Sequence, residues 1–202
     1  MGLAIESEAE AIGRAVAALN AAHDEDPHRR LHQGVERPVE RVWCDTVADW
    51  VMRLAPGASA ALRLAAHSQH LERWQDPRSN WPEGRAGYLR WRKARQRAHA
   101  DRAQQLLADA GCEHRLIERV QQLIRKEQLA RDPEAALLED AACLTFLELD
   151  LADFAARHDR EDVLRILRKT WQKMSPAGRN AARGMTLPNV SAELVAEALA
   201  DG

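Results

Sequence analysis

Residues 62–74 read Leu-Arg-Leu-Ala-Ala-His-Ser-Gln-His-Leu-Glu-Arg-Trp, and residues 88–92 read Tyr-Leu-Arg-Trp-Arg. Apolar residues recur in the first segment at spacings of three and four, which predicts a helix from Ala60 to about Trp74. Two stripes share this helix: Leu64, His67, Leu71 and Trp74 form one, and Leu62, Ala66, His70 and Arg73 form the other. At least one of the two histidines therefore faces inward.

The composition extends this helical pattern to the whole chain. Ala, Leu, Arg and Glu dominate, while β-branched and aromatic residues are sparse, and this favours helix over sheet. A chain of 202 residues suits one domain with a sizeable core. We expect an all-α, single-domain bundle, residues 1–202, of about eight helices. They are expected at about 6–22, 38–54, 60–74, 86–110, 113–128, 133–154, 159–174 and 191–200, with loops at 23–37 and 75–87.

Several classes of protein fit the composition poorly. The three cysteines are an odd number without a CxxC pair, which argues against a disulfide framework and a zinc ribbon. No segment approaches the 18 or so consecutive apolar residues that a membrane span needs, and the N-terminal stretch lacks the features of a signal peptide. We expect a soluble, cytoplasmic chain with reduced thiols. The net charge of −2 confines any attraction for anions to a local patch.

Helical phase predicts that a few polar side chains point inward. His99 begins a stripe that continues through Ala103, Leu106 and Ala110, and Asp140 begins one through Leu144, Leu147 and Leu151. Glu127 ends a stripe that starts at Leu116. A buried carboxylate is costly unless it is paired, so Asp140 needs a partner, which a histidine or an arginine can supply.

These residue types have a chemical use together. Neutral imidazole and carboxylate oxygen bind divalent Mn, Fe or Zn, whereas guanidinium groups hold phosphate through paired hydrogen bonds. A bound metal would make water a nucleophile near neutral pH. Four aromatic residues could stack on a base: Trp74, Trp81, Tyr88 and Trp91. For each residue taken singly, an ordinary place in the core or on a solvated face is the alternative.

The order of helices resembles that of the HD phosphohydrolase superfamily over about residues 38–155, with residues 160–200 packed on this core. The likeness rests on Ala65–His70, on His99 at the start of an apolar stripe, and on the run Leu-Glu-Asp-Ala-Ala-Cys-Leu at 138–144. The resemblance implies metal-dependent hydrolysis of phosphate esters, with His67 or His70, His99 and Asp140 as metal ligands. The chain departs from that pattern because Leu71 follows His70 and because Asp140 begins Asp-Ala-Ala instead of Asp-Ala-Asp.

Over nearly its full length the chain also resembles the uncharacterised family called domain of unknown function 4202. The segments that carry this resemblance are Gln69–Leu71, Arg73–Trp74, Pro77–Arg78, Arg85–Arg92, His99–Ala100, Ile124–Glu127, Leu138–Asp140 and Leu167–Pro176. The family label implies no activity.

Three functions are compatible with the sequence. The first is a metal-dependent phosphohydrolase acting on a nucleotide or another phosphate ester, with Glu127 and Asp140 as catalytic groups. Its substrate would be held by Arg73, Trp74, Arg78, Tyr88, Arg90, Arg92, Arg125 and Lys126. The second is a module that binds RNA or a nucleotide through residues 73–102 without chemistry. The third is a structural protein whose arginines pair with acidic helices of a partner.

Overall fold

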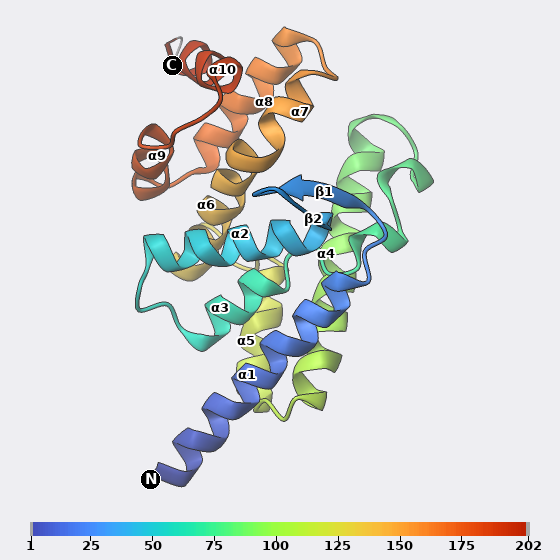
Figure 1. The fold of residues 1–202 in the computed structure, drawn as a ribbon, viewed down its shortest axis with the longest axis vertical. Helices are drawn as coiled ribbons and strands as arrows, with labels where there is room; N and C mark the ends of the chain where they lie inside the picture. The colour runs from blue at the N-terminus through green and yellow to red at the C-terminus, as the bar shows by residue number, and fades with distance from the viewer. Residues whose placement is uncertain (1, 201–202) are drawn as a thin grey trace.

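The computed structural model describes residues 2–200 and shows a mostly helical fold with one small β-hairpin (Figure 1). Within these residues the elements are α1 (Gly2–Asp24), β1 (Arg29–His32), β2 (Val35–Pro38), α2 (Val39–Leu54), α3 (Ala60–His67), η1 (Arg73–Gln75), η2 (Arg78–Asn80), α4 (Gly84–Asp109), α5 (His114–Ile124), α6 (Pro133–Thr145), η3 (Phe146–Asp150), α7 (Leu151–Ala155), α8 (Arg160–Lys173), α9 (Pro176–Arg183) and α10 (Asn189–Ala200). None of these helices is long and apolar enough to cross a membrane.

Helix α2 lies at the centre of the molecule (Figure 1). It packs on α3 and α6, while α5 packs on both α3 and α4, so that these five helices enclose the main core. Val47, Leu64, Leu123 and Leu144 point into that core and are fully buried. Removing such side chains from water supplies about 1.5–3 kcal/mol each, which explains why the helices pack along their apolar stripes.

The prediction of an all-α chain is wrong between Arg29 and Pro38. These residues form an antiparallel hairpin in which Arg29 pairs with Pro38 and His32 with Val35. Gln33 and Gly34 form the turn, and both have positive φ, 51° and 80°. This matches the two-residue turns that suit the twist of a hairpin. The strands escaped prediction because each has only four residues, mostly charged or polar, and shows no clear alternation of apolar and polar side chains.

The third helix is shorter than expected. It ends at His67 instead of Trp74, and the chain then turns through His70 and Glu72, which have the left-handed φ values of 57° and 53°. The amide of Arg73 donates to the carbonyl of His70, which closes the turn. Helical phase therefore does not apply beyond His67, and the orientation of His70 follows from the turn.

The C-terminal part of the chain contains two further departures. The helix expected over 133–154 is interrupted by the π-helical segment η3, and α9 occupies a segment that we expected to be irregular. The hydroxyl of Ser175 caps α9 by accepting the amide hydrogen of Gly178. Helix α8 contacts α6, and α10 packs on α7 and α8. The described residues thus contain ten α-helices where about eight were predicted.

Candidate functional site

A cavity of about 250 Å³ lies between α2, the turn that follows α3, α4, α5, α6 and α8. We call it the histidine pocket because His70 and His99 line it. Trp43, Tyr88 and Trp91 supply aromatic walls. The pocket is closed on one side by Phe146, Ala142 and Cys143, which occupy one face of α6 and the start of η3.

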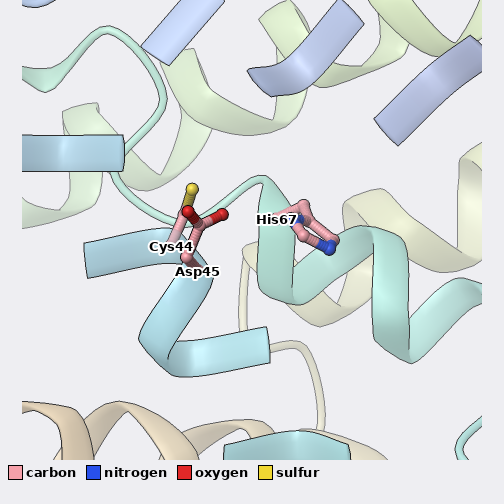
Figure 2. A group of neighbouring side chains, drawn as sticks. All are labelled: Cys44, Asp45 and His67. Atoms are coloured by element: carbon pink, nitrogen blue, oxygen red, sulfur yellow. The ribbon is translucent and has the colours of Figure 1, made fainter. Parts of the chain in front are cut away.

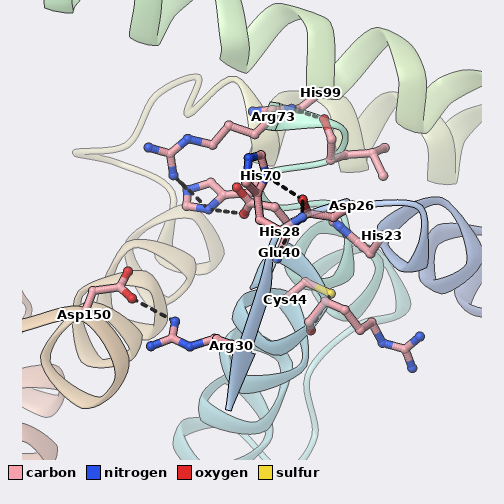
Figure 3. Close-up of polar contacts among 12 residues, drawn as sticks. His23, Asp26, His28, Arg30, Glu40, Cys44, His70, Arg73, His99 and Asp150 are labelled. Carbon is pink, nitrogen blue, oxygen red and sulfur yellow. Dashed lines mark hydrogen bonds and ion pairs between the residues drawn. The ribbon is translucent and has the colours of Figure 1, made fainter. Parts of the chain in front are cut away.

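His70 contacts three side chains, of which Glu40 and Arg73 are shown in Figure 3. Its ring stacks on Trp43 with centroids 4.5 Å apart and planes inclined by 16°. Its Nδ1 lies 3.0 Å from Oε2 of Glu40, and Nη1 of Arg73 lies 3.1 Å from Nε2. This arrangement fits an imidazole that donates through Nδ1 to Glu40 and accepts at Nε2 from Arg73.

Burial opposes the charged forms of both His70 and Glu40. The pKa of His70 lies well below its ordinary value of 6.5 because the ring is buried and because Arg73 is adjacent. Burial also raises the pKa of Glu40, against the opposing effect of the Arg73 guanidinium. Desolvation disfavours the charged form of both groups. His70 is therefore an uncharged imidazole at neutral pH.

His99 approaches His70 from α4. The ring centroids are 6.4 Å apart. Nδ1 of His99 lies 2.6 Å from the carbonyl oxygen of Leu71, and since a carbonyl only accepts, Nδ1 carries the hydrogen. Burial, followed by the nearby His70, lowers the pKa of His99 to about 3. The Nε2 atom of His99 is consequently a hydrogen-bond acceptor.

Positive charge is in excess around the histidines. Among the lining residues of the histidine pocket, five are cationic and one is a carboxylate. The cations are Arg73, Arg92, Arg95, Lys126 and Lys173, and the carboxylate is Glu139. An anion entering this pocket would meet cationic groups from the α3–α4 connection, α4, the end of α5 and α8.

Glu139 organises part of this charge. Its carboxylate is ion-paired with Lys126, and Arg92 lies 3.9 Å from its other oxygen. Burial alone would raise the pKa of Glu139, but Lys126 and then Arg92 outweigh burial and hold that pKa below its ordinary value. Glu139 is thus ionised; it holds Lys126 at the pocket wall and lies near Arg92 without a hydrogen bond to it.

Two of the lining residues have strained backbones. His70 has φ 57° and Lys126 has φ 56°, and neither is a glycine. A left-handed conformation costs such residues about 1–3 kcal/mol and is common where a side chain must be aimed at a site. Both positions deliver a polar side chain into the same pocket.

The structure brings together six of the predicted site residues. They are Arg73, Tyr88, Arg92, Lys126, His70 and His99. The helical period correctly predicted that His99 lies in the interior, where its exposed fraction is 5%.

Asp140 faces inward as predicted, but its partner is not a histidine or an arginine. It is 3% exposed and accepts hydrogen bonds from the amide and the hydroxyl of Ser175. A β-carbon on Gly178 would lie 2.5 Å from the Asp140 carboxyl carbon, so α9 approaches this carboxylate closely. Asp140 therefore joins α6 to α9 and does not line the histidine pocket.

The remaining predicted residues lie outside the pocket. Glu127, expected at the inner end of its helix, is exposed because α5 ends at Ile124. Arg125 pairs with Asp101 at 3.0 Å. The Arg78 guanidinium donates to the carbonyls of Trp81 and Pro82 and so stabilises its own loop.

Two predicted residues close to the pocket do not line it. Arg90 is exposed on α4, although Arg92 on the same helix lines the pocket. Trp74 is half-buried in η1.

His67 lies apart, beside Cys44 and Asp45 of α2 (Figure 2). One potential ligand atom from each of these three residues lies within 4.8 Å of the others, and no other group of this kind occurs within residues 2–200. Asp45 is already paired with Arg37 at 2.6 Å and with Arg41 at 3.1 Å. Burial raises the pKa of the Cys44 thiol well above its ordinary value.

The predicted metal ligands therefore do not converge on one ion. His67 is on one side of the turn, His70 and His99 line the histidine pocket, and Asp140 is bonded to Ser175. The five cations of the histidine pocket also oppose the entry of a divalent cation. The metal implied by the HD resemblance does not fit these residues as a single site.

Sequence reasoning missed Glu40, Trp43, Glu139 and Lys173. A usable signal existed for Glu139, because Glu139, Ala142 and Phe146 share one helical face at spacings of three and four. Glu40 offered no such signal. Its place depends on the hairpin, where buried Asp26 accepts the amide hydrogen of Glu40 and fixes the start of α2.

Comparison with known proteins identifies the family of this chain. The family model described as Domain of unknown function (DUF4202) matches residues 13–195, which is most of the chain. No curated protein and no solved structure is significantly similar to this chain.

Proposed function

Since this chain belongs to the family described as Domain of unknown function (DUF4202), which names no activity, we propose a function from the site itself: the histidine pocket binds and hydrolyses a phosphate ester. The proposed substrate is a nucleotide or another small phosphate-containing molecule. The observation that carries this proposal is the group of five cations around a single ionised carboxylate beside two neutral histidines.

The cations suit a phosphate group. Arg92 lies 3.9 Å from Glu139, which is longer than a hydrogen bond, and this leaves its guanidinium free to donate to a ligand. Lys173 forms no ion pair with any residue of the described chain. Arginine can bind two phosphate oxygens at once, and lysine adds a point charge. The rings of Tyr88 and Trp91, with centroids 6.0 Å apart, supply a surface for a nucleobase.

Hydrolysis is supported by the pair of His70 and Glu40. In the proposed reaction Arg73 moves its hydrogen bond from Nε2 of His70 to the phosphate, and a water molecule hydrogen-bonded to Nε2 of His99 attacks phosphorus. The new P–O bond forms as the ester P–O bond breaks. His70 takes one proton of water, the leaving oxygen takes a proton from solvent as it departs, and His70 then returns its proton to solvent. The negative phosphate raises the pKa of His70, and Glu40 stabilises the imidazolium.

The more specific predictions stand as part of this proposal. An HD-like core over residues 38–155 is supported by the common location of His70 and His99 with a carboxylate from α6. Exposed Glu127 and Ser175-bonded Asp140 are poorly placed for proton transfer in this pocket, so His70 takes that role in the proposal. The cations supply the charge that a metal supplies in the HD superfamily. A bound Mn, Fe or Zn stays a prediction, and no step here depends on it.

A binding module without chemistry is the second candidate. It is favoured by the low pKa of both histidines, which makes each a weak base. In that case the pocket recognises a nucleotide or RNA through the same cations and aromatic rings.

Calorimetric titration with inorganic phosphate and adenosine monophosphate tests the binding. We expect Arg92→Ala to weaken both ligands about tenfold or more, which corresponds to one charge-assisted hydrogen bond of about 1.4 kcal/mol. Arg90→Ala is the matched control, because Arg90 is exposed on the same helix and does not line the pocket. Equal effects of the two substitutions, or no binding to the wild type, would contradict the proposal.

Release of phosphate from nucleotide substrates tests the chemistry. His70→Asn retains a hydrogen-bonding side chain that tolerates left-handed backbone, so we expect it to preserve the fold and abolish turnover. If His70→Asn binds substrate and no wild-type turnover is found with any phosphate ester, the binding module is the correct function.

A further inference from the structure

A second cavity, of about 530 Å³, lies on the outer side of α4. We call it the outer cavity. Arg92 and Gln96, one helical turn apart on α4, line both the outer cavity and the histidine pocket. The two cavities are therefore neighbours that share a wall, and Arg92 can donate to a ligand in either.

The outer cavity is also cationic. Besides Arg92 it is lined by Lys93, Arg97 and Arg125, against the single carboxylate of Glu127. Lys93 and Arg97 are exposed and form no ion pair with any residue in the described part of the chain. Arg125 is already engaged by Asp101 at 3.0 Å. The two unpaired cations hold no internal anion, so their charge is available to an external one.

Two large, exposed side chains that follow one another on α4 line the two cavities. Tyr88 lines the histidine pocket and is 44% exposed, and the next residue, Leu89, lines the outer cavity and is 51% exposed. Large exposed side chains of this kind suit the face of a nucleobase. An inorganic polyphosphate would make no use of them, whereas a nucleotide chain would.

Building on the proposed function, we infer that the two cavities form one elongated site for a single-stranded oligonucleotide that ends in a phosphate. The terminal phosphate lies in the histidine pocket, the first base stacks on Tyr88, and the next phosphate binds Lys93 and Arg97 in the outer cavity. Arg92 bridges the two phosphates. A basic groove with an aromatic platform is the usual means of binding single strands irrespective of sequence.

The test compares four probes: inorganic phosphate, adenosine monophosphate, and the 5′-phosphorylated adenylyl dinucleotide in its ribo and deoxyribo forms. We expect a dinucleotide to bind at least tenfold more tightly than the monophosphate. The double variant Lys93→Ala/Arg97→Ala should remove that gain and leave the monophosphate unchanged, and Arg90→Ala should affect neither. Tyr88→Ala should weaken the nucleotides and spare inorganic phosphate.

The outcomes separate the two proposals. If the ribo or the deoxyribo dinucleotide binds more tightly than the monophosphate, the elongated site is supported. A preference for one of the two dinucleotides then shows whether the ligand is RNA or DNA. If phosphate and the monophosphate bind but the dinucleotides bind no better, or if the double variant weakens the monophosphate equally, the elongated site is wrong while the proposed function holds. If no probe binds, including phosphate, the proposed function itself fails.

Discussion

The carboxylate of Asp140 accepts two hydrogen bonds from Ser175, one of them from the backbone amide at 2.8 Å. Ser175 is at the same time the residue that caps α9. Asp140 therefore fixes the start of α9 on α6 from a fully buried position. A carboxylate used in this way has few free lone pairs for a metal or a substrate.

Replacement of Asp140 should lower the stability of the fold and leave the affinity for phosphate unchanged. Asp140→Ala leaves the amide of Ser175 without a partner, and we expect a loss of about 1–3 kcal/mol in the free energy of unfolding, measured by urea denaturation. Ser175→Ala should also be destabilising, because it removes the hydroxyl that bonds Asp140 and caps α9. At temperatures where the variant is folded, phosphate binding should match the wild type; lost binding in a folded Asp140→Ala protein would instead support the predicted catalytic role.

The buried His99 predicts a pH dependence of stability. Its pKa is about 3 in the folded chain and near 6.5 when exposed, so below pH 6.5 the unfolded state binds a proton that the folded state does not. The contribution of His99 to the free energy of unfolding should fall by about 1.4 kcal/mol per pH unit between pH 6.5 and about 3.

The pKa of Glu40 is raised, so its contribution to the free energy of unfolding grows as the pH falls, opposite to that of His99. The effect of His99 is therefore measured as the difference in stability between the wild type and a variant that lacks this histidine. His99→Asn keeps an amide donor near the position of Nδ1, facing the Leu71 carbonyl, and cannot titrate. Urea denaturation of both proteins from pH 7 to pH 5 should show the wild type losing stability relative to His99→Asn as the pH falls. Parallel curves would mean that the pKa of His99 is the same in the folded and unfolded states.

Substitutions of Lys126 and Glu139 should have non-additive effects on the free energy of unfolding, because the two side chains form an ion pair. Lys126→Asn tolerates the left-handed backbone but leaves the buried Glu139 carboxylate without its main partner. We expect Lys126→Asn to destabilise the fold by more than 1 kcal/mol, and Glu139→Gln in the same protein to recover part of that loss. Strict additivity in the double-mutant cycle would show that the pair does not interact.

Metal content should separate the two groups of histidines. We expect any transition metal bound by protein purified without chelator or nickel to be retained in His99→Ala and lost in His67→Ala. The reason is that only His67 lies in a group of three potential ligands within the described residues. Elemental analysis measures this directly, and loss of metal in His99→Ala would restore the metal site that the HD resemblance implies.

The sequence determined most of the helices and the inward faces of His99 and Asp140. Both follow from the 3.6-residue period, which is a local property of the chain. The family was also recognisable from sequence, because residues 13–195 match it.

Only the tertiary structure decided how the site is assembled. The left-handed turns at His70 and Lys126 break the helical period, so phase could not show that both side chains enter one pocket. Glu40 reaches His70, thirty positions along the chain, because the hairpin fixes the start of α2. Asp140 accepts hydrogen bonds from Ser175 instead of a histidine because α9 packs against α6. Such pairings depend on contacts between distant segments, and a periodic pattern within one helix carries no information about them.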